Sequence, residues 1–172
     1  MACNQISGIT YTCLTSAGGI KKMYITNFSN ITGTTANGIG TITDIEMVDG
    51  TKFQEFQFQR DTSSYEEDTM INIQNGTTFY NQTVHLVIPR RDAAKNAAIS
   101  VLANGQPLLA LIVEDYNGLY WYIGLATGAY LTQGKSGSGV KRTDANDYKL
   151  TFIAEEVAPA PEVDAEIIAS II

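Results

Sequence analysis

The fold of this chain is decided by residues 108–123, which have the sequence Leu108-Leu109-Ala110-Leu111-Ile112-Val113-Glu114-Asp115-Tyr116-Asn117-Gly118-Leu119-Tyr120-Trp121-Tyr122-Ile123. Residues 108–113 are apolar at every position, which is typical of a central strand that is buried on both faces. Asn117-Gly118 is the strongest signal for a tight hairpin turn in the sequence. Residues 119–123 are therefore predicted to return beside this strand.

Most of the remaining chain is also predicted to form strands. Apolar and polar residues alternate in 22–28, 41–48 and 79–88, and again near the final strand at 148–153. This period of two is typical of half-buried strands, and Asn75-Gly76 indicates a further hairpin turn. We therefore expect a mainly β fold with one domain from about Lys22 to Glu155.

One substantial helix is predicted, at Arg90–Ala103. Alanine, valine and leucine recur there at spacings of three and four, after Pro89 and before Asn104-Gly105. Arg90 and Arg91 would lie in its first turn, where positive charge opposes the helix dipole. Two interpretations stay open: the arginines have a partner outside the helix, or they are simply solvated.

Composition excludes several classes of protein. The chain has 172 residues, of which 44% are hydrophobic and 17% charged, and its net charge is −7. This charge argues against a protein that grips nucleic acid in a basic groove. No stretch is apolar enough to span a membrane, and the N-terminus does not resemble a signal peptide, so we expect no membrane binding. Two cysteines, Cys3 and Cys13, give no disulfide framework and favour a reducing compartment.

The residues needed for catalysis are scarce. His85 is the one histidine, and strand alternation places it with Thr83 and Val87 on a face opposite the apolar residues. A zinc site needs about four convergent ligands, which the cysteines and histidine together do not supply. Glu66 and Glu67 are adjacent, so a strand would direct them to opposite faces. We expect no enzymatic activity, no metal and no cofactor.

The polar segment from Arg60 to Phe79 is predicted to be an intersubunit element. Connections longer than about 12–15 residues are uncommon in compact domains unless they have a role. A plain surface loop is the alternative. Together with Arg90 and Arg91, the candidate assembly residues in and near this segment are Thr62, Ser63, Tyr65, Glu66 and Glu67.

The C-terminal residues 156–172 are predicted to form an extended arm. An acidic tether with Pro159 and Pro161 leads to an apolar tip. Such a tip is expected to dock on its own domain or on a neighbouring copy, and the length of the tether favours the neighbour. The residues expected to be buried there are Ile167, Ile168, Ile171 and Ile172. Residues 1–21 would form an N-terminal arm.

Several pieces of the sequence together resemble a known family. They are Met1-Ala2-Cys3 with Cys13, residues 17–24 (AGGIKKMY), residues 74–80 (QNGTTFY), residues 91–95 (RDAAK), residues 114–121 (EDYNGLYW) and residues 147–152 (DYKLTF). The chain resembles in these pieces a family of tailed-bacteriophage virion proteins, found among crAss-like and related phages. Its predicted element order also resembles the tail-tube fold, a β-barrel or sandwich with one flanking α-helix.

The resemblance implies a structural role in the virion. It implies a homo-oligomeric ring, a hexamer by preference, that forms a tail tube or neck channel through which double-stranded DNA passes. The ring would contact other virion proteins and would assemble in the cytoplasm of the bacterial host. An acidic protein fits such a channel, because each phosphate neutralised by lysine or arginine would add affinity and drag. The acidity also has a plain alternative, which is solubility.

Two other functions stay open from the sequence. One is an auxiliary capsid protein that decorates the phage head as a trimer or binds capsomers. The other is a carbohydrate- or receptor-binding β-module that uses Tyr120, Trp121 and Tyr122 as a stacking surface. Alternation divides these three aromatic residues between two faces, and burial of Trp121 in the core is the preferred interpretation.

Overall fold

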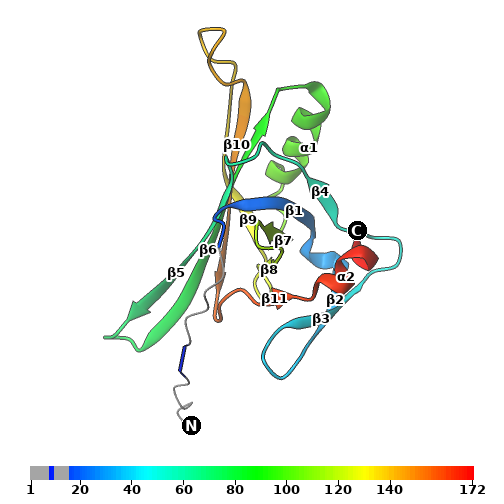
Figure 1. Cartoon of the computed structure of the whole chain (residues 1–172), viewed down its shortest axis with the longest axis vertical. Helices are drawn as coiled ribbons and strands as arrows, with labels where there is room; N and C mark the ends of the chain where they lie inside the picture. Colours follow the sequence, from blue (N-terminus) through cyan, green and yellow to red (C-terminus); the bar gives the residue numbers. More distant parts are fainter. Residues whose placement is uncertain (1–7, 10–15) are drawn as a thin grey trace.

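The computed structural model describes residues 8–9 and 16–172, and in them the chain is mainly β (Figure 1). The expectations for Cys3, Cys13 and most of the N-terminal arm lie outside the described residues. The elements are β1 (Ile20–Asn27), a 3-10 turn η1 (Phe28–Asn30), β2 (Ile31–Ala36), β3 (Ile42–Met47), β4 (Gln54–Phe56), β5 (Ser64–Asn72), β6 (Thr77–Pro89), α1 (Ala93–Ala103), β7 (Leu109–Asp115), β8 (Tyr120–Ile123), β9 (Tyr130–Gly137), β10 (Asp147–Glu156), β11 (Glu162–Val163) and α2 (Ala165–Ile171).

The strands form two sheets that pack face to face. Sheet A has seven strands in the order β2-β3-β11-β8-β7-β1-β4, and sheet B has four in the order β5-β6-β10-β9. In the described part of the chain neither sheet closes on itself, so the arrangement is sandwich-like and is no closed barrel. The predicted mainly β class is confirmed at this level.

The main core lies between the two sheets. Sheet B contributes Val84, Leu86 and Ile88 from β6, the residues that alternation assigns to one face. Apolar side chains of β1 and β7 cover them from sheet A. The buried residues of this core are Ile20, Met23, Ile25, Val84, Leu86, Ile88, Leu109, Leu111, Val113, Ile123, Ala129, Tyr148, Leu150, Phe152 and Ala154.

Sheet A is also covered on its other face, which makes it the central layer. There Ala110 and Ile112 of β7 meet Phe53 and the C-terminal helix α2 in a second core. Strand β7 is buried from Leu109 to Glu114, with odd residues in one core and even residues in the other. The prediction of a central strand buried on both faces is confirmed.

The predicted hairpin after β7 is confirmed. Asn117 and Gly118 form the turn between β7 and β8, and Gly118 has φ 82°, a conformation that glycine adopts without strain. The Asp115 carboxylate supports the turn, since its Oδ1 accepts from the backbone N–H groups of Asn117 at 2.7 Å and Leu119 at 3.0 Å.

Helix α1 begins at Ala93 rather than at Arg90. Asp92 is the N-cap, and its Oδ1 accepts from the Lys95 backbone N–H at 2.8 Å. Arg90 and Arg91 therefore precede the helix, and the predicted conflict with its dipole does not arise. Within the described residues no side chain of α1 is fully buried, so the helix lies at the margin of the core.

The predicted extended C-terminal arm is wrong. Strand β11 inserts between β3 and β8, where Val163 lies beside Ile42 and Tyr120. Helix α2 then packs Ile168 and Ile171 into the second core, at 5% and 6% exposure. The physical reason is that the second face of sheet A is apolar and needs a cover, which this segment supplies.

Backbone contacts hold the tail in place. The Asp164 side chain accepts from the Glu166 N–H at 3.0 Å and starts α2. The Ile171 carbonyl accepts from the Phe53 N–H at 2.8 Å, and the Lys52 ammonium donates to the Ile172 carbonyl. The apolar tip therefore docks on its own domain and not on a neighbour.

Residues 64–79 are strand and turn rather than a long connection, and the intersubunit role of residues 60–79 stays a prediction. Strand β5 begins at Ser64 and pairs with β6 through Asn72, and residues 73–76 form the turn that Asn75-Gly76 predicts. The two strands form a long hairpin that projects beyond the body of the molecule (Figure 1, lower left). Sequence alternation near Glu66 is polar on both sides, which concealed the strand.

Candidate assembly surfaces

Sheet B has two open edges. Strands β5 and β9 end the strand order, and in the described residues neither has a second partner. Open edges present unpaired backbone N–H and C=O groups, which are a template for pairing with another chain. Both edge strands are long, with nine and eight residues.

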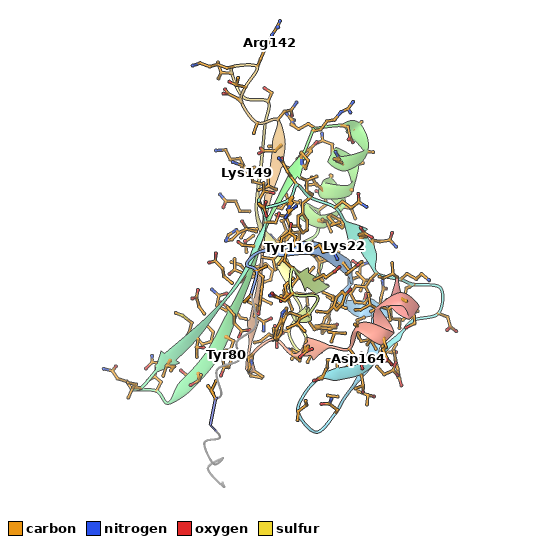
Figure 2. All side chains as sticks on the ribbon, viewed as in Figure 1. Lys22, Tyr80, Tyr116, Arg142, Lys149 and Asp164 are labelled. Atoms are coloured by element: carbon orange, nitrogen blue, oxygen red, sulfur yellow. The ribbon has the colours of Figure 1, made fainter. Side chains whose placement is uncertain are left out.

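The face of sheet B that points away from sheet A, here called the outer face, is mostly polar. In β6 and β10 the buried residues alternate with Thr83, His85, Lys149 and Thr151. Lys149 points away from the body of the molecule (Figure 2). His85 Nδ1 lies 3.1 Å from Thr151 Oγ1. The histidine is thus an exposed strand residue of this face, as predicted.

Charges are separated along the outer face. Glu66, Asp68 and Glu155 lie toward the hairpin, and Asp68 and Glu155 occupy positions on either side of the same β6 residue. Toward the other end, Lys149 is directly opposite Lys135 on β9. Like charges directly opposite each other destabilise a sheet, and the Asp147 carboxylate lies two residues from Lys149 on the same face.

A buried polar network ties the stem of the hairpin to the body. Glu67 Oε2 accepts from the Tyr65 hydroxyl at 2.9 Å, from Gln82 Nε2 at 3.1 Å and from the Ala160 N–H at 2.8 Å. Gln82 Oε1 in turn accepts from the Gly124 N–H at 3.1 Å. Burial, and next the Glu67 carboxylate, raise the pKa of Tyr65, so its hydroxyl stays a donor.

Thr62 and Ser63 shape the entry into β5. Ser63 is buried, and its Oγ accepts from the Val87 N–H at 3.1 Å. Thr62 is exposed, and its Oγ1 donates to the Gln59 carbonyl at 2.6 Å. Of the assembly residues predicted between 62 and 67, the structure therefore exposes Thr62 and Glu66, whereas Ser63, Tyr65 and Glu67 have partners inside the chain.

Arg90 and Arg91 lie at the end of β6, away from the predicted polar segment. The Arg91 guanidinium carbon is 5.8 Å from the centre of the Tyr148 ring, within cation–π range. Arg90 has φ 60°, and its N–H donates to the Asn146 carbonyl at 2.7 Å. Arg91 thus has a partner outside α1, which was one of the two interpretations.

The predicted isoleucines do not belong to an exposed surface. Ile168 and Ile171 are buried in the second core, and Ile167 and Ile172 pack against the same core while half-buried. The structure therefore brings these four together with one another but not with the assembly residues of β5.

The aromatic residues of β8 form no stacking platform. Tyr122 is fully buried in the second core, and Tyr120 packs against that core. Trp121 points the other way and packs, partly buried, against the main core, with its Nε1 3.4 Å from Asp115 Oδ2. The predicted division between two faces is confirmed.

Within residues 8–9 and 16–172, no group of three or more His, Cys, Asp or Glu is placed to hold a metal ion. Among the same residues, no helix combines the length and apolar character that crossing a membrane requires. Glu66 lies on the outer face while Glu67 turns inward to Ala160, so these two carboxylates diverge.

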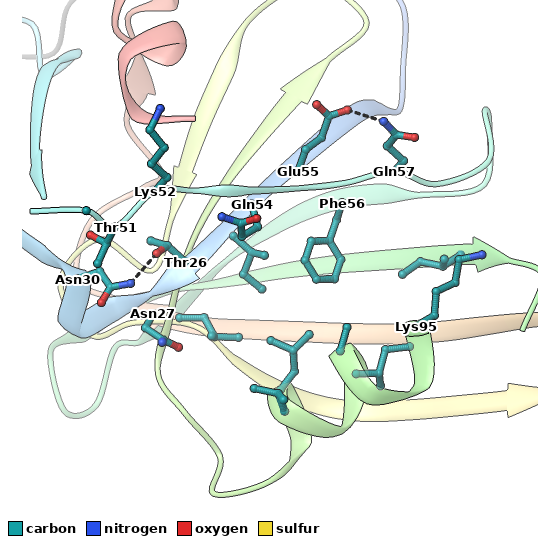
Figure 3. A pocket seen from close by; sticks show the side chains of 18 residues that line it. Thr26, Asn27, Asn30, Thr51, Lys52, Gln54, Glu55, Phe56, Gln57 and Lys95 are labelled. Atoms are coloured by element: carbon teal, nitrogen blue, oxygen red, sulfur yellow. Dashed lines mark hydrogen bonds between the residues drawn. The ribbon is translucent and has the colours of Figure 1, made fainter. Parts of the chain in front are cut away.

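A groove of about 830 Å³ lies between α1, β1 and β4, and sequence reasoning missed it (Figure 3). Its apolar lining includes Ile25, Phe56, Ile99, Val101 and Leu102. The signal in the sequence was weak, because an alanine-rich helix gives no indication of how closely it packs on a sheet.

The tip of the β5–β6 hairpin, residues 70–79, carries exposed apolar side chains that sequence reasoning also missed. Met70 is 46%, Ile71 67%, Ile73 90% and Phe79 39% exposed. The sequence does contain a signal for this exposed apolar tip, because the four residues lie beside a tight turn in a segment, 69–79, that carries no charge.

Comparisons with known proteins add no identity to this geometry. No family model matches the chain, and neither a curated protein nor a solved structure matches it.

Proposed function

We propose that this chain is a structural virion protein that self-assembles into rings, forming the tail tube or neck channel through which phage DNA passes. The observation that carries the proposal is sheet B, which is open at both edges and polar on its outer face. The protein acts without catalysis, contacts other virion proteins, and assembles in the cytoplasm of the bacterial host.

The edges of sheet B suit repeated addition of copies. Each neighbouring pair in the sheet is antiparallel, so with four strands β5 and β9 run in opposite directions. When β5 of one copy lies beside β9 of the next, their pairing is antiparallel again and the sheet continues without a change of pattern. Such a contact uses two different surfaces, and it closes into a ring when the rotation between copies allows.

The outer face suits the lining of a channel. Its central positions carry Thr83, His85 and Thr151, which are polar, and around them the carboxylates of Glu66, Asp68 and Glu155 outnumber Lys135 and Lys149. Six copies at −7 each carry about −42 in total, which opposes binding of DNA phosphates. Under this proposal the duplex is a passing cargo that the ring does not grip.

The test is direct imaging of the purified chain. We expect hollow rings or tubes in negative-stain micrographs, and a mass near six copies by light scattering. Compact trimers that bind capsid proteins would favour the head-decorating alternative, and a strict monomer that binds glycans would favour the receptor-binding module. A fluorescence anisotropy titration with a DNA duplex should show no binding by the rings at physiological salt.

A further inference from the structure

The two open edges of sheet B carry opposite charges on the outer face. Strand β5 carries Glu66 and Asp68 there, both exposed. On β9 the exposed Lys135 lies opposite Lys149, and these two lysines share one neighbouring carboxylate, Asp147. Within the described residues, none of Glu66, Asp68 and Lys135 belongs to an ion pair. The β5 edge is therefore negative and the β9 edge positive.

We propose that β5 of one copy pairs with β9 of the next in the register that places Glu66 directly opposite Lys135. The inference rests on the proposed ring, and it names the register and the ion pair that join the copies. Side chains of the outer face stay on that face only when the register changes in steps of two residues. The outer positions then pair as Ser64 with Gly137, Glu66 with Lys135, Asp68 with Gln133 and Met70 with Tyr130.

The backbone favours close contact between Glu66 and Lys135. The Val87 N–H donates to Ser63 Oγ at 3.1 Å, and the Val87 carbonyl accepts from the Gln59 N–H at 3.4 Å. Outer-face residues of β6, such as Val87, therefore direct their backbone groups toward β5. Because these groups alternate along each strand, outer-face residues at the β5–β9 junction form non-hydrogen-bonded pairs, in which the side chains lie closer together.

The register also gives a sheet that can close into a ring. Within one copy Glu66 is level with Tyr130, through Thr83 and Ile153. Across the junction Tyr130 meets Met70 of the next copy, so each copy is displaced along the strands by the distance from Glu66 to Met70. This displacement is about 13 Å over a sheet width of about 19 Å. The strands then tilt by about 35° from the ring axis, within the range of about 35–45° seen in closed sheets.

A second register would also place a carboxylate opposite Lys135, namely that of Asp68. Tyr130 would then lie opposite Asn72, and the larger displacement would tilt the strands by about 46°, above the range for closed sheets. The same change would separate Met70 from Tyr130, which are 46% and 37% exposed in the single copy. The register with Glu66 opposite Lys135 is therefore favoured by both closure and apolar contact.

Charge reversal tests the ion pair. Glu66→Lys and Lys135→Glu should each raise the protein concentration needed for assembly about tenfold, because each places like charges opposite one another. Both changes in one chain should restore wild-type assembly. All circular dichroism spectra should match that of the wild type, since both side chains are exposed. Asp68→Lys combined with Lys135→Glu is the matched control and should leave assembly impaired, because Glu66 still faces the new carboxylate.

Cysteine cross-linking tests the register. In a background with Cys3→Ser and Cys13→Ser, a chain with Glu66→Cys and Lys135→Cys should give disulfide-linked multimers under mild oxidation, since directly opposite Cβ atoms lie about 5 Å apart. The control chain, with Asp68→Cys and Lys135→Cys, should link far less. If rings form but the Asp68 chain links instead, or neither chain links, the register is overturned and the ring proposal stands. If the wild type stays monomeric at every concentration and neither chain links, both are overturned.

Discussion

Replacement of Ile168 by alanine tests whether the C-terminal helix stabilises its own domain. Ile168 is 5% exposed in the second core and packs with Ile171 against β3 and Val163. Removing its buried methylene and methyl groups loses about 0.8 kcal/mol each in transfer free energy, and the cavity left behind adds to this. The expected loss in the free energy of unfolding is therefore about 2–5 kcal/mol.

The assay is urea unfolding of the monomer, followed by circular dichroism at two protein concentrations. For a chain of this size each kcal/mol lowers the melting temperature by roughly 2–4 °C, so thermal unfolding should shift clearly as well. The matched control is Ile39→Ala, the same substitution at an 89% exposed position, which should stay within about 0.5 kcal/mol of wild type. If Ile168→Ala is equally harmless in the monomer, the tail does not pack on its own sheet and the argument fails.

Three further predictions concern buried polar groups and a turn. Tyr122→Phe should leave stability unchanged or raise it by about 1 kcal/mol, because the Tyr122 hydroxyl is buried without a hydrogen-bond partner in the described structure. Burial, and then Glu156, raise the pKa of Tyr122, so the folded state holds this proton more tightly than the unfolded state does. The contribution of this raised pKa to the free energy of unfolding is complete below pH 10 and declines at higher pH. In urea unfolding between pH 9 and 11, the free energy of unfolding should therefore fall less steeply with pH in Tyr122→Phe than in the wild type. Glu67→Gln should lower the free energy of unfolding by about 1–3 kcal/mol, since one amide oxygen replaces a carboxylate that accepts three hydrogen bonds. Glu66→Gln, on the outer face, is the control and should leave the free energy of unfolding almost unchanged in the same urea denaturation. Asp115→Ala should lower the free energy of unfolding by about 1–2 kcal/mol, because it removes the carboxylate that accepts from two N–H groups of the turn. An unchanged melting temperature would contradict this role.

The parts of the fold that the sequence predicts are those with a strong local signal. Residues 108–113 are apolar throughout, and Asn117-Gly118 requires a turn, so β7 and β8 follow from short-range physics. The alternation around His85 likewise predicts which residues of β6 face the core. In each case the period of the pattern is enough to assign the face.

The parts that failed depend on what lies across space. Nothing near residues 156–172 indicates that the second face of sheet A is bare and that Val163 fits between Ile42 and Tyr120. Strand β5 is polar on its exposed face. Glu67 points inward because Gln82 Nε2 and the Ala160 N–H donate hydrogen bonds to its carboxylate. Of the candidate site, the sequence therefore located the hairpin segment but not its apolar tip or the groove.

Strand β11 has a consequence for how the molecule opens. Among the strands that the structure describes, the β2–β3 hairpin pairs with the rest of sheet A only through this two-residue strand, with Val163 opposite Ile42 on one side and Tyr120 on the other. When β11 detaches, β2 and β3 lose their backbone pairing with the rest of sheet A, while β7 and β1 keep theirs. Amide hydrogen exchange in β2 and β3 should therefore report a partial opening that costs less free energy than global unfolding, and the slowest amides should lie in β7.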